Sequence, residues 1–147
     1  MKTALNRRQT LLAGLGLVLS WRAVATPAEM DAEVRAFSGG APVREGRLNF
    51  EIAPLVENGN TVPITLAVDS PMTASDHVQA IAVFNGGNPQ PQVAVFRLGP
   101  RAGKAVVNTR IRLATSQTLT AVARLSDGSH WSRTVDVVVT LAACVEG

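Results

Sequence analysis

Apolar and polar residues alternate with a period of two along most of the chain beyond residue 40. Such alternation is typical of β-strands that bury one face. No helical pattern long enough for a crossover between parallel strands separates the alternating runs, so the strands are expected to pair antiparallel. The runs occupy residues 48–52, 62–68, 78–84, 93–98, 107–113, 119–125 and 131–141. The pattern predicts an all-β fold, an immunoglobulin-like antiparallel β-sandwich of about seven strands within residues 41–141.

Turn-forming residues separate these runs. Asp127-Gly128 lies between the last two runs, and an Asp-Gly pair in that position is a strong signal for a hairpin. Pro63 has no backbone N–H to donate to a sheet, so it predicts either an edge strand or the start of a strand.

Residues 26–40 have a helical pattern instead. Thr26 can cap a helix, a proline follows in the first turn, and Glu29 completes a capping box. An apolar stripe with helical spacing follows, formed by Met30, Val34 and Phe37. The glycine pair at 39 and 40 ends the pattern. We therefore expect a short N-terminal helix that packs its stripe on the sandwich core or on a partner.

The first 25 residues resemble an export signal. Lys2, Arg7 and Arg8 precede an apolar run at 11–19 that is too short to span a bilayer, and Ala23-Val24-Ala25 is a small-x-small cleavage site. The sequence Asn-Arg-Arg-Gln-Thr-Leu-Leu at 6–12 is similar to a twin-arginine (Tat) signal. The prediction is a cleaved Tat-type peptide, a periplasmic destination and no membrane attachment after cleavage.

Removal of this peptide changes the charge of the protein. The full chain has a net charge of +3, but four basic residues and no acidic residue lie in the peptide. The mature chain then has 10 basic against 11 acidic residues, which does not favour a nucleic-acid partner. A local basic stretch remains, and it is read either as solvated outward faces of strands or as a contact for an acidic partner or anionic substrate. It comprises Arg97, Arg101, Lys104, Arg110 and Arg112.

The chain has a single cysteine, Cys144, followed by only three residues. A lone cysteine cannot form an internal disulfide, and in an oxidising compartment it suggests an intermolecular disulfide or a reactive thiol. Chain ends are mobile unless they are tied down, so the thiol is expected on a short projecting tail. An inert thiol that packs as a small hydrophobic side chain is the other interpretation.

Other chemical groups are sparse. Neither His77 nor His130 has neighbours with the spacing of a metal site, and His130 reads as a turn residue beside the hairpin. No glycine-rich phosphate loop is present. We therefore predict no cofactor and no metal.

Three stretches resemble the SoxY family, the sulfur carriers of the bacterial thiosulfate-oxidising Sox system. They are residues 57–72 with Glu-Asn-Gly-Asn-Thr-Val-Pro and Val-Asp-Ser-Pro-Met, residues 96–131 with Phe-Arg-Leu-Gly-Pro, Thr-Arg-Ile-Arg-Leu-Ala and Ser-Asp-Gly-Ser-His-Trp, and the Val-rich final run before Cys144. The resemblance implies an immunoglobulin-like fold, a heterodimer with a second sandwich subunit, SoxZ, and periplasmic Sox enzymes that act on a group bound to the carrier.

The resemblance also implies a role for the C-terminus. Cys144 is the attachment residue for thiosulfate, and residues 142–147 form a carrier arm: Ala142, Ala143, Cys144, Val145, Glu146 and Gly147. The usual arm of the family is Gly-Gly-Cys-Gly-Gly, so this arm is bulkier and has an added negative charge. That charge disfavours a thiolate and repels anionic sulfur compounds, weakly if the arm is solvated.

The expected function is therefore a periplasmic carrier protein that is not itself an enzyme. The main alternative is an assembly module whose Cys144 forms only an intermolecular disulfide. An independent thiol enzyme would need a base beside Cys144, and the sequence shows none.

Overall fold

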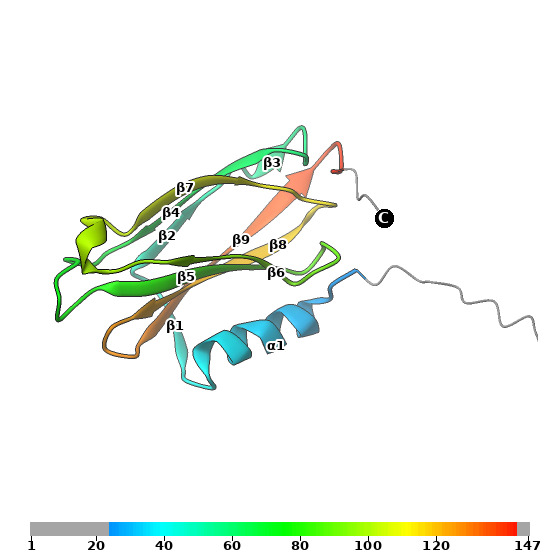
Figure 1. Cartoon of the computed structure of the whole chain (residues 1–147). Helices are drawn as coiled ribbons and strands as arrows, with labels where there is room; N and C mark the ends of the chain where they lie inside the picture. The colour runs from blue at the N-terminus through cyan, green and yellow to red at the C-terminus, as the bar shows by residue number, and fades with distance from the viewer. Residues whose placement is uncertain (1–23, 144–147) are drawn as a thin grey trace, which may run out of the picture.

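The computed structural model of the chain describes residues 24–143. Within them, nine strands and two helical segments follow one another (Figure 1). Their bounds are α1 (Pro27–Ser38), β1 (Val43–Glu45), β2 (Leu48–Glu51), β3 (Leu55–Val56), β4 (Val62–Val68), β5 (Val78–Asn85), β6 (Gln92–Arg97), η1 (Pro100–Ala102), β7 (Val106–Ile111), β8 (Gln117–Leu125) and β9 (His130–Val139).

Two sheets stack face to face. The larger sheet has the strand order β1-β9-β8-β5-β6, with β3 also paired to β9, and the smaller sheet has the order β2-β4-β7. Figure 1 shows the smaller sheet above the larger one and α1 beneath the larger one. The predicted β-sandwich with a short N-terminal helix is confirmed.

Both faces of the larger sheet are buried along β5. Ile81 and Val83 face the smaller sheet and join the main core, whereas Ala82 and Phe84 belong to a second cluster on the opposite face. Successive side chains of a strand point to opposite faces, so a continuous apolar run needs a cover on each side. The helix α1 supplies the second cover.

The ends of α1 have the predicted caps. The backbone N–H of Glu29 donates to Thr26 Oγ1 at 3.3 Å, and the Glu29 carboxylate accepts from the Thr26 backbone N–H at 2.7 Å. Gly39 ends the helix with φ of 63°, a left-handed conformation that glycine adopts without strain. The Met30 stripe packs on Phe84 and its neighbours. No helix within residues 24–143 is long and apolar enough to cross a bilayer.

The two shortest strands were not expected from the sequence. Both β1 and β3 pair with β9, and both pairings are parallel. They lie along the same edge of the larger sheet, β1 beside the beginning of β9 and β3 beside its end. The sandwich is therefore antiparallel in its centre and parallel at this one edge.

The expected hairpin and strand start are both present. β8 and β9 pair antiparallel around Gly128, which has φ of 82°. Pro63 is the second residue of β4 and lies opposite Arg110 of β7. β4 is the middle strand of its sheet, but β2 pairs with it only from Thr65 to Val68, so Pro63 lies beyond the β2 ladder. The strand-start interpretation is thus confirmed and the edge-strand interpretation is wrong.

Candidate functional site

Four residues of the predicted arm, Cys144, Val145, Glu146 and Gly147, lie outside the described residues. The described chain ends with Ala142, which is exposed, and Ala143, which is only 7% exposed. The described part of the chain therefore ends at Ala143, the residue that directly precedes Cys144.

Backbone hydrogen bonds tie this end of the chain to the sandwich. The N–H of Ala143 donates to the Leu113 carbonyl at 3.0 Å, and the N–H of Gly59 donates to the Leu141 carbonyl at 2.8 Å. The N–H of Leu113 in turn donates to the Gly59 carbonyl at 2.8 Å. The three segments meet at one junction, which we call the exit junction: Gly59, Leu113 and Ala143. Of the predicted arm, Ala143 is thus held by the sandwich.

The exit junction requires a glycine at position 59. A Cβ atom on this residue would lie 2.3 Å from the Leu113 carbonyl oxygen and 2.9 Å from the Ala143 nitrogen. Both neighbours are backbone atoms that cannot swing aside. The close approach of three backbones therefore depends on the absence of a side chain here.

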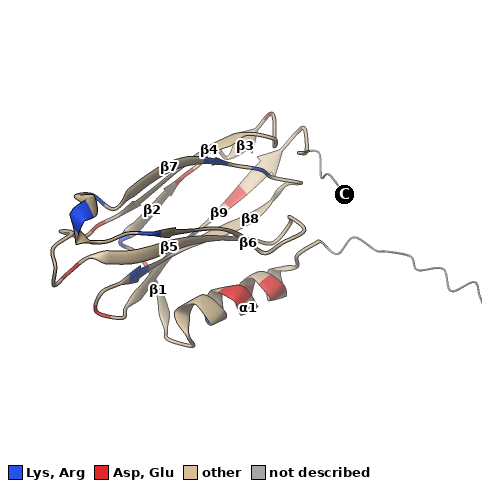
Figure 2. Cartoon of the chain, in the orientation of Figure 1, with Lys and Arg blue, Asp and Glu red and all other residues tan. Residues whose placement is uncertain are grey.

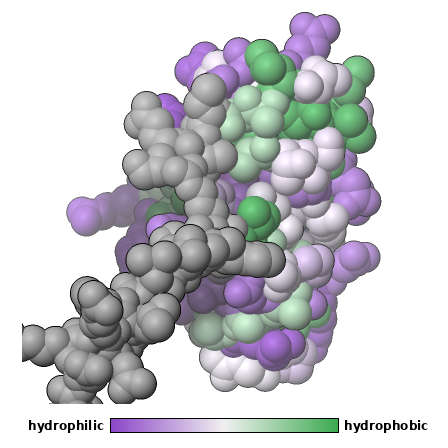
Figure 3. Space-filling model, turned by 90° about the vertical axis from the view of Figure 1, so that its right-hand side faces the viewer, coloured by the Kyte–Doolittle hydropathy of each residue, from purple (hydrophilic) through white to green (hydrophobic). Residues whose placement is uncertain are grey.

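Exposed apolar side chains lie at the same end of the molecule. Leu55 and Val138 are partners in the β3–β9 ladder and are 57% and 55% exposed, and Leu141 is 60% exposed. Figure 3 looks onto this end of the sandwich and shows apolar surface gathered toward one side.

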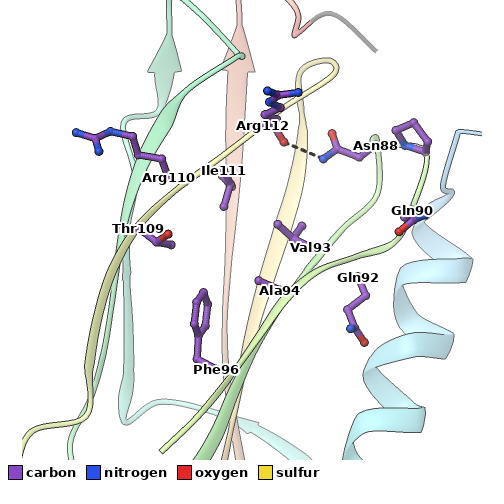
Figure 4. A pocket seen from close by; sticks show the side chains of 11 residues that line it. Asn88, Gln90, Gln92, Val93, Ala94, Phe96, Thr109, Arg110, Ile111 and Arg112 are labelled. Carbon is purple, nitrogen blue, oxygen red and sulfur yellow. Dashed lines mark hydrogen bonds between the residues drawn. The ribbon is translucent and has the colours of Figure 1, made fainter. Parts of the chain in front are cut away.

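A groove opens between β6 and β7, the edge strands of the two sheets. It has a volume of about 680 Å³. Its apolar lining includes Val93, Phe96 and Ile111, which are part of the main core or packed against it. Its polar lining comprises Asn88, Gln90, Gln92, Thr109, Arg110 and Arg112 (Figure 4). We call this cavity the edge groove.

Asn88 fixes one end of the edge groove. Its Nδ2 donates to the Arg112 carbonyl at 2.8 Å, and its Oδ1 accepts from the Ala114 N–H at 2.9 Å (Figure 4). The loop that presents Asn88 is itself held by Asn85, whose buried Oδ1 accepts from the Asn88 N–H at 2.6 Å. The β5–β6 loop is thereby tied to the end of β7.

The basic stretch identified in the sequence lies along this edge. Its members are all exposed, as expected for outward faces of strands. Figure 2 marks basic residues on β6, on β7 and at η1 between them. Of these, Arg110 and Arg112 line the edge groove, whereas Arg101 is at η1.

The structure places the two histidines away from this end. His77 Nδ1 lies 3.0 Å from the Thr73 carbonyl oxygen. His130 is not a turn residue as expected: it is the first residue of β9, 5% exposed and edge-on to Phe37 of α1. Burial lowers its pKa below the ordinary value, and the nearby Arg124 guanidinium lowers the pKa further. Within residues 24–143, no group of three or more potential metal-ligating side chains occurs.

The exit junction and the edge groove could not be identified from the sequence. In the sequence, Gly59 stands out only as part of a stretch that carries the family resemblance. The residues that form the groove come from β6, β7 and the β5–β6 loop, which the fold alone brings together.

Comparisons with known proteins agree with this architecture. The structure of the sulfur carrier protein SoxY from Chlorobium limicola f thiosulfatophilum is similar with a TM-score of 0.65 and 29% identity, over 78% of this chain and 98% of that one. Superoxide reductases share the fold. The protein from Ignicoccus hospitalis (neelaredoxin) has a TM-score of 0.57 and 16% identity, over 79% of this chain and 94% of its own. A putative superoxide reductase from Thermotoga maritima has a TM-score of 0.55 and 22% identity, over 70% of this chain and 89% of its own.

None of the curated proteins compared with the chain matches it. The family described as "Sulfur oxidation protein SoxY" matches residues 34–144, which is most of the chain and ends on the cysteine. The chain therefore belongs to the SoxY family of sulfur oxidation proteins.

Proposed function

We propose that this protein is a carrier of sulfur compounds, and that it binds thiosulfate-derived intermediates covalently on Cys144. The observation that supports this most directly is positional. The only cysteine of the chain follows Ala143, which the exit junction holds at the end of the sandwich. The similar protein from Chlorobium limicola is described as a sulfur carrier.

The chemistry needs a thiolate that forms a sulfur–sulfur bond with the cargo. A thiolate does so by attack on a sulfur atom, and the resulting adduct is removed by reductant. The protein serves as the substrate-bearing subunit, and separate enzymes attach and process the bound group. Anchoring of Ala143 gives these enzymes a fixed point on the carrier, one residue before Cys144 in the sequence.

The proposal includes partners and a location. The partners are a SoxZ-like subunit in a heterodimer and periplasmic Sox enzymes, and export uses the Tat pathway. Cleavage after Ala25 would remove the hydrogen bond of its N–H to the Asn88 carbonyl at 2.8 Å. The capping box would survive, because Thr26 and Glu29 both remain in the mature chain.

Intact mass measurement of the mature protein tests the proposal. The protein is purified with its neighbouring partner subunit and exposed to thiosulfate and the periplasmic enzymes, then to reductant. We expect the mass to increase by that of a thiosulfate-derived group. The added mass should map to the Cys144 peptide, and reductant should remove it. An unmodified mass, or only a disulfide-linked pair of chains, would contradict the carrier function and favour the assembly module.

A further inference from the structure

The charges of this protein are unevenly distributed along the chain. Residues 77–126 contain no Asp or Glu, although the full chain has 11 acidic residues. The same stretch has six cationic residues, namely Arg97, Arg101, Lys104, Arg110, Arg112 and Arg124. It builds β5, β6, β7 and β8, so all residues that line the edge groove belong to the acid-free stretch of the sequence.

The edge groove offers donors to an anion. Arg110 and Arg112 are among its lining residues, and none of the described lining residues is acidic. Arginine side chains have only donors and match the oxygen atoms of oxoanions. The Asn88 loop is held by the hydrogen bonds described above, so this end of the groove is formed before any ligand arrives.

The groove also lies close to the exit junction. Arg112 precedes Leu113, whose carbonyl accepts from the Ala143 N–H, and Cys144 follows Ala143. The arginine end of the groove and the last described residue before Cys144 thus meet at the end of β7.

From these observations we infer that the Arg110–Arg112 end of the edge groove binds sulfur oxoanions, either free or attached to Cys144. This inference rests on the proposed function, because it takes Cys144 as the attachment residue. The site would concentrate the anionic compound beside the thiol.

Tetrathionate is a suitable probe because it needs no enzyme. The Cys144 thiolate attacks a central sulfur atom of the tetrathionate dianion, forms a sulfur–sulfur bond to a thiosulfonate group and expels thiosulfate dianion. No further oxidant is required. A neutral disulfide, 4,4′-dithiodipyridine, reacts with the same thiolate without a charge preference, and it therefore reports the reactivity of the thiol itself.

The first test compares second-order rate constants for the two reagents at low ionic strength. In the double variant Arg110→Gln/Arg112→Gln, we expect the tetrathionate-to-neutral rate ratio to fall about three- to tenfold, and less at high salt. The matched control is Arg101→Gln/Lys104→Gln, which removes the same charge at η1 and just beyond it. Its ratio should change by less than about twofold. Equal ratios in both double variants would overturn the inference.

The second test separates free from attached ligand. Amide and side-chain NMR signals of Asn88 and Arg112 are followed in Cys144→Ser during titration with thiosulfate, and in the wild-type protein before and after loading with tetrathionate. Shifts in the first experiment support binding of the free anion, and shifts in the second support binding of the attached group. Absence of both would overturn the inference.

The two proposals can fail separately. If thiosulfate and the Sox enzymes never load Cys144, the carrier function fails even where the arginine variants alter the rate ratio. If loading succeeds and the ratio is unaffected by the arginines, only the oxoanion site fails.

Discussion

Gly59 shows how one residue determines the position of the last described residues of the chain. Its N–H donates to Leu141 and its carbonyl accepts from Leu113, so it bridges the β7 end and the β9 end. The bridge is possible because the backbone of Gly59 can approach the Leu113 oxygen closely. Any side chain would place carbon where backbone atoms already lie, and the neighbouring segments would have to separate.

We expect Gly59→Ala to lower the free energy of unfolding by about 3 kcal/mol, because the new methyl group overlaps fixed backbone atoms. Denaturant unfolding measures this loss. The control is Gly99→Ala, since Gly99 has extended dihedral angles and no atom within 4 Å of the position that a methyl group would take. Amide exchange at Ala143 should rise in Gly59→Ala alone. Equal stability of the two variants would contradict the role of Gly59.

The sequence shows the polar residues that later line the edge groove, but not which of them form hydrogen bonds with one another. The sequence Asn-Gly-Gly-Asn at 85–88 correctly predicts that a strand ends there. The hydrogen bond from Asn88 to Arg112 joins residues 24 apart. Such a partner depends on how two sheets stack, which the local pattern does not contain.

At the scale of elements, α1 covers an ionisable side chain. His130 is buried beneath it, and neither ring nitrogen has a hydrogen-bond partner among the described residues. Arg124 of β8 is its neighbour in the β8–β9 ladder, and Asp127 lies in the adjoining turn. Burial first, and Arg124 second, lower the pKa of His130, whereas the backbone of Gly128 and then Asp127 act in the opposite direction.

This arrangement predicts that stability falls on mild acidification. The ordinary pKa of a histidine side chain is 6.5, and the folded protein holds that of His130 below it. As the pH falls through about 6.5, the unfolded chain takes up a proton that the folded protein does not. The free energy of unfolding should therefore decrease between about pH 7 and pH 5.

Denaturant unfolding at several pH values measures the decrease. His130→Phe keeps an aromatic ring beneath α1 and should flatten the profile, whereas His77→Gln should not, since His77 lies outside this cluster. A profile of His130→Phe that is as steep as that of the wild-type protein would refute the assignment.

Elements with a long regular pattern could be predicted, and short ones could not. The seven alternating runs correspond to the seven longer strands, and the capping box and glycine stop of α1 are where the sequence places them. β1 and β3 have three and two residues, too few for a period of two to be visible. They form because β9 offers an open edge, and the chain returns to it only in the folded protein.

At the scale of the whole molecule, the proposed chemistry is concentrated at one end of the sandwich. The exit junction, the end of β7 and the Asn88 loop all meet there. The hydrophobic core lies between the sheets, and a second cluster lies under α1. If the proposed attachment at Cys144 is correct, stability and cargo attachment depend on different residues, since neither core cluster includes the cysteine among its described members.

Replacement of Cys144 by Ser tests this separation. The hydrogen bonds of the exit junction use backbone atoms of Gly59, Leu113 and Ala143, and none of them needs a thiol at position 144. We expect the free energy of unfolding to change by less than about 0.5 kcal/mol, as for a substitution away from the core. Adduct formation, measured by intact mass after treatment with tetrathionate, should be abolished. A loss of stability above about 1 kcal/mol would instead show that the thiol packs as a small hydrophobic side chain, the structural role considered from the sequence.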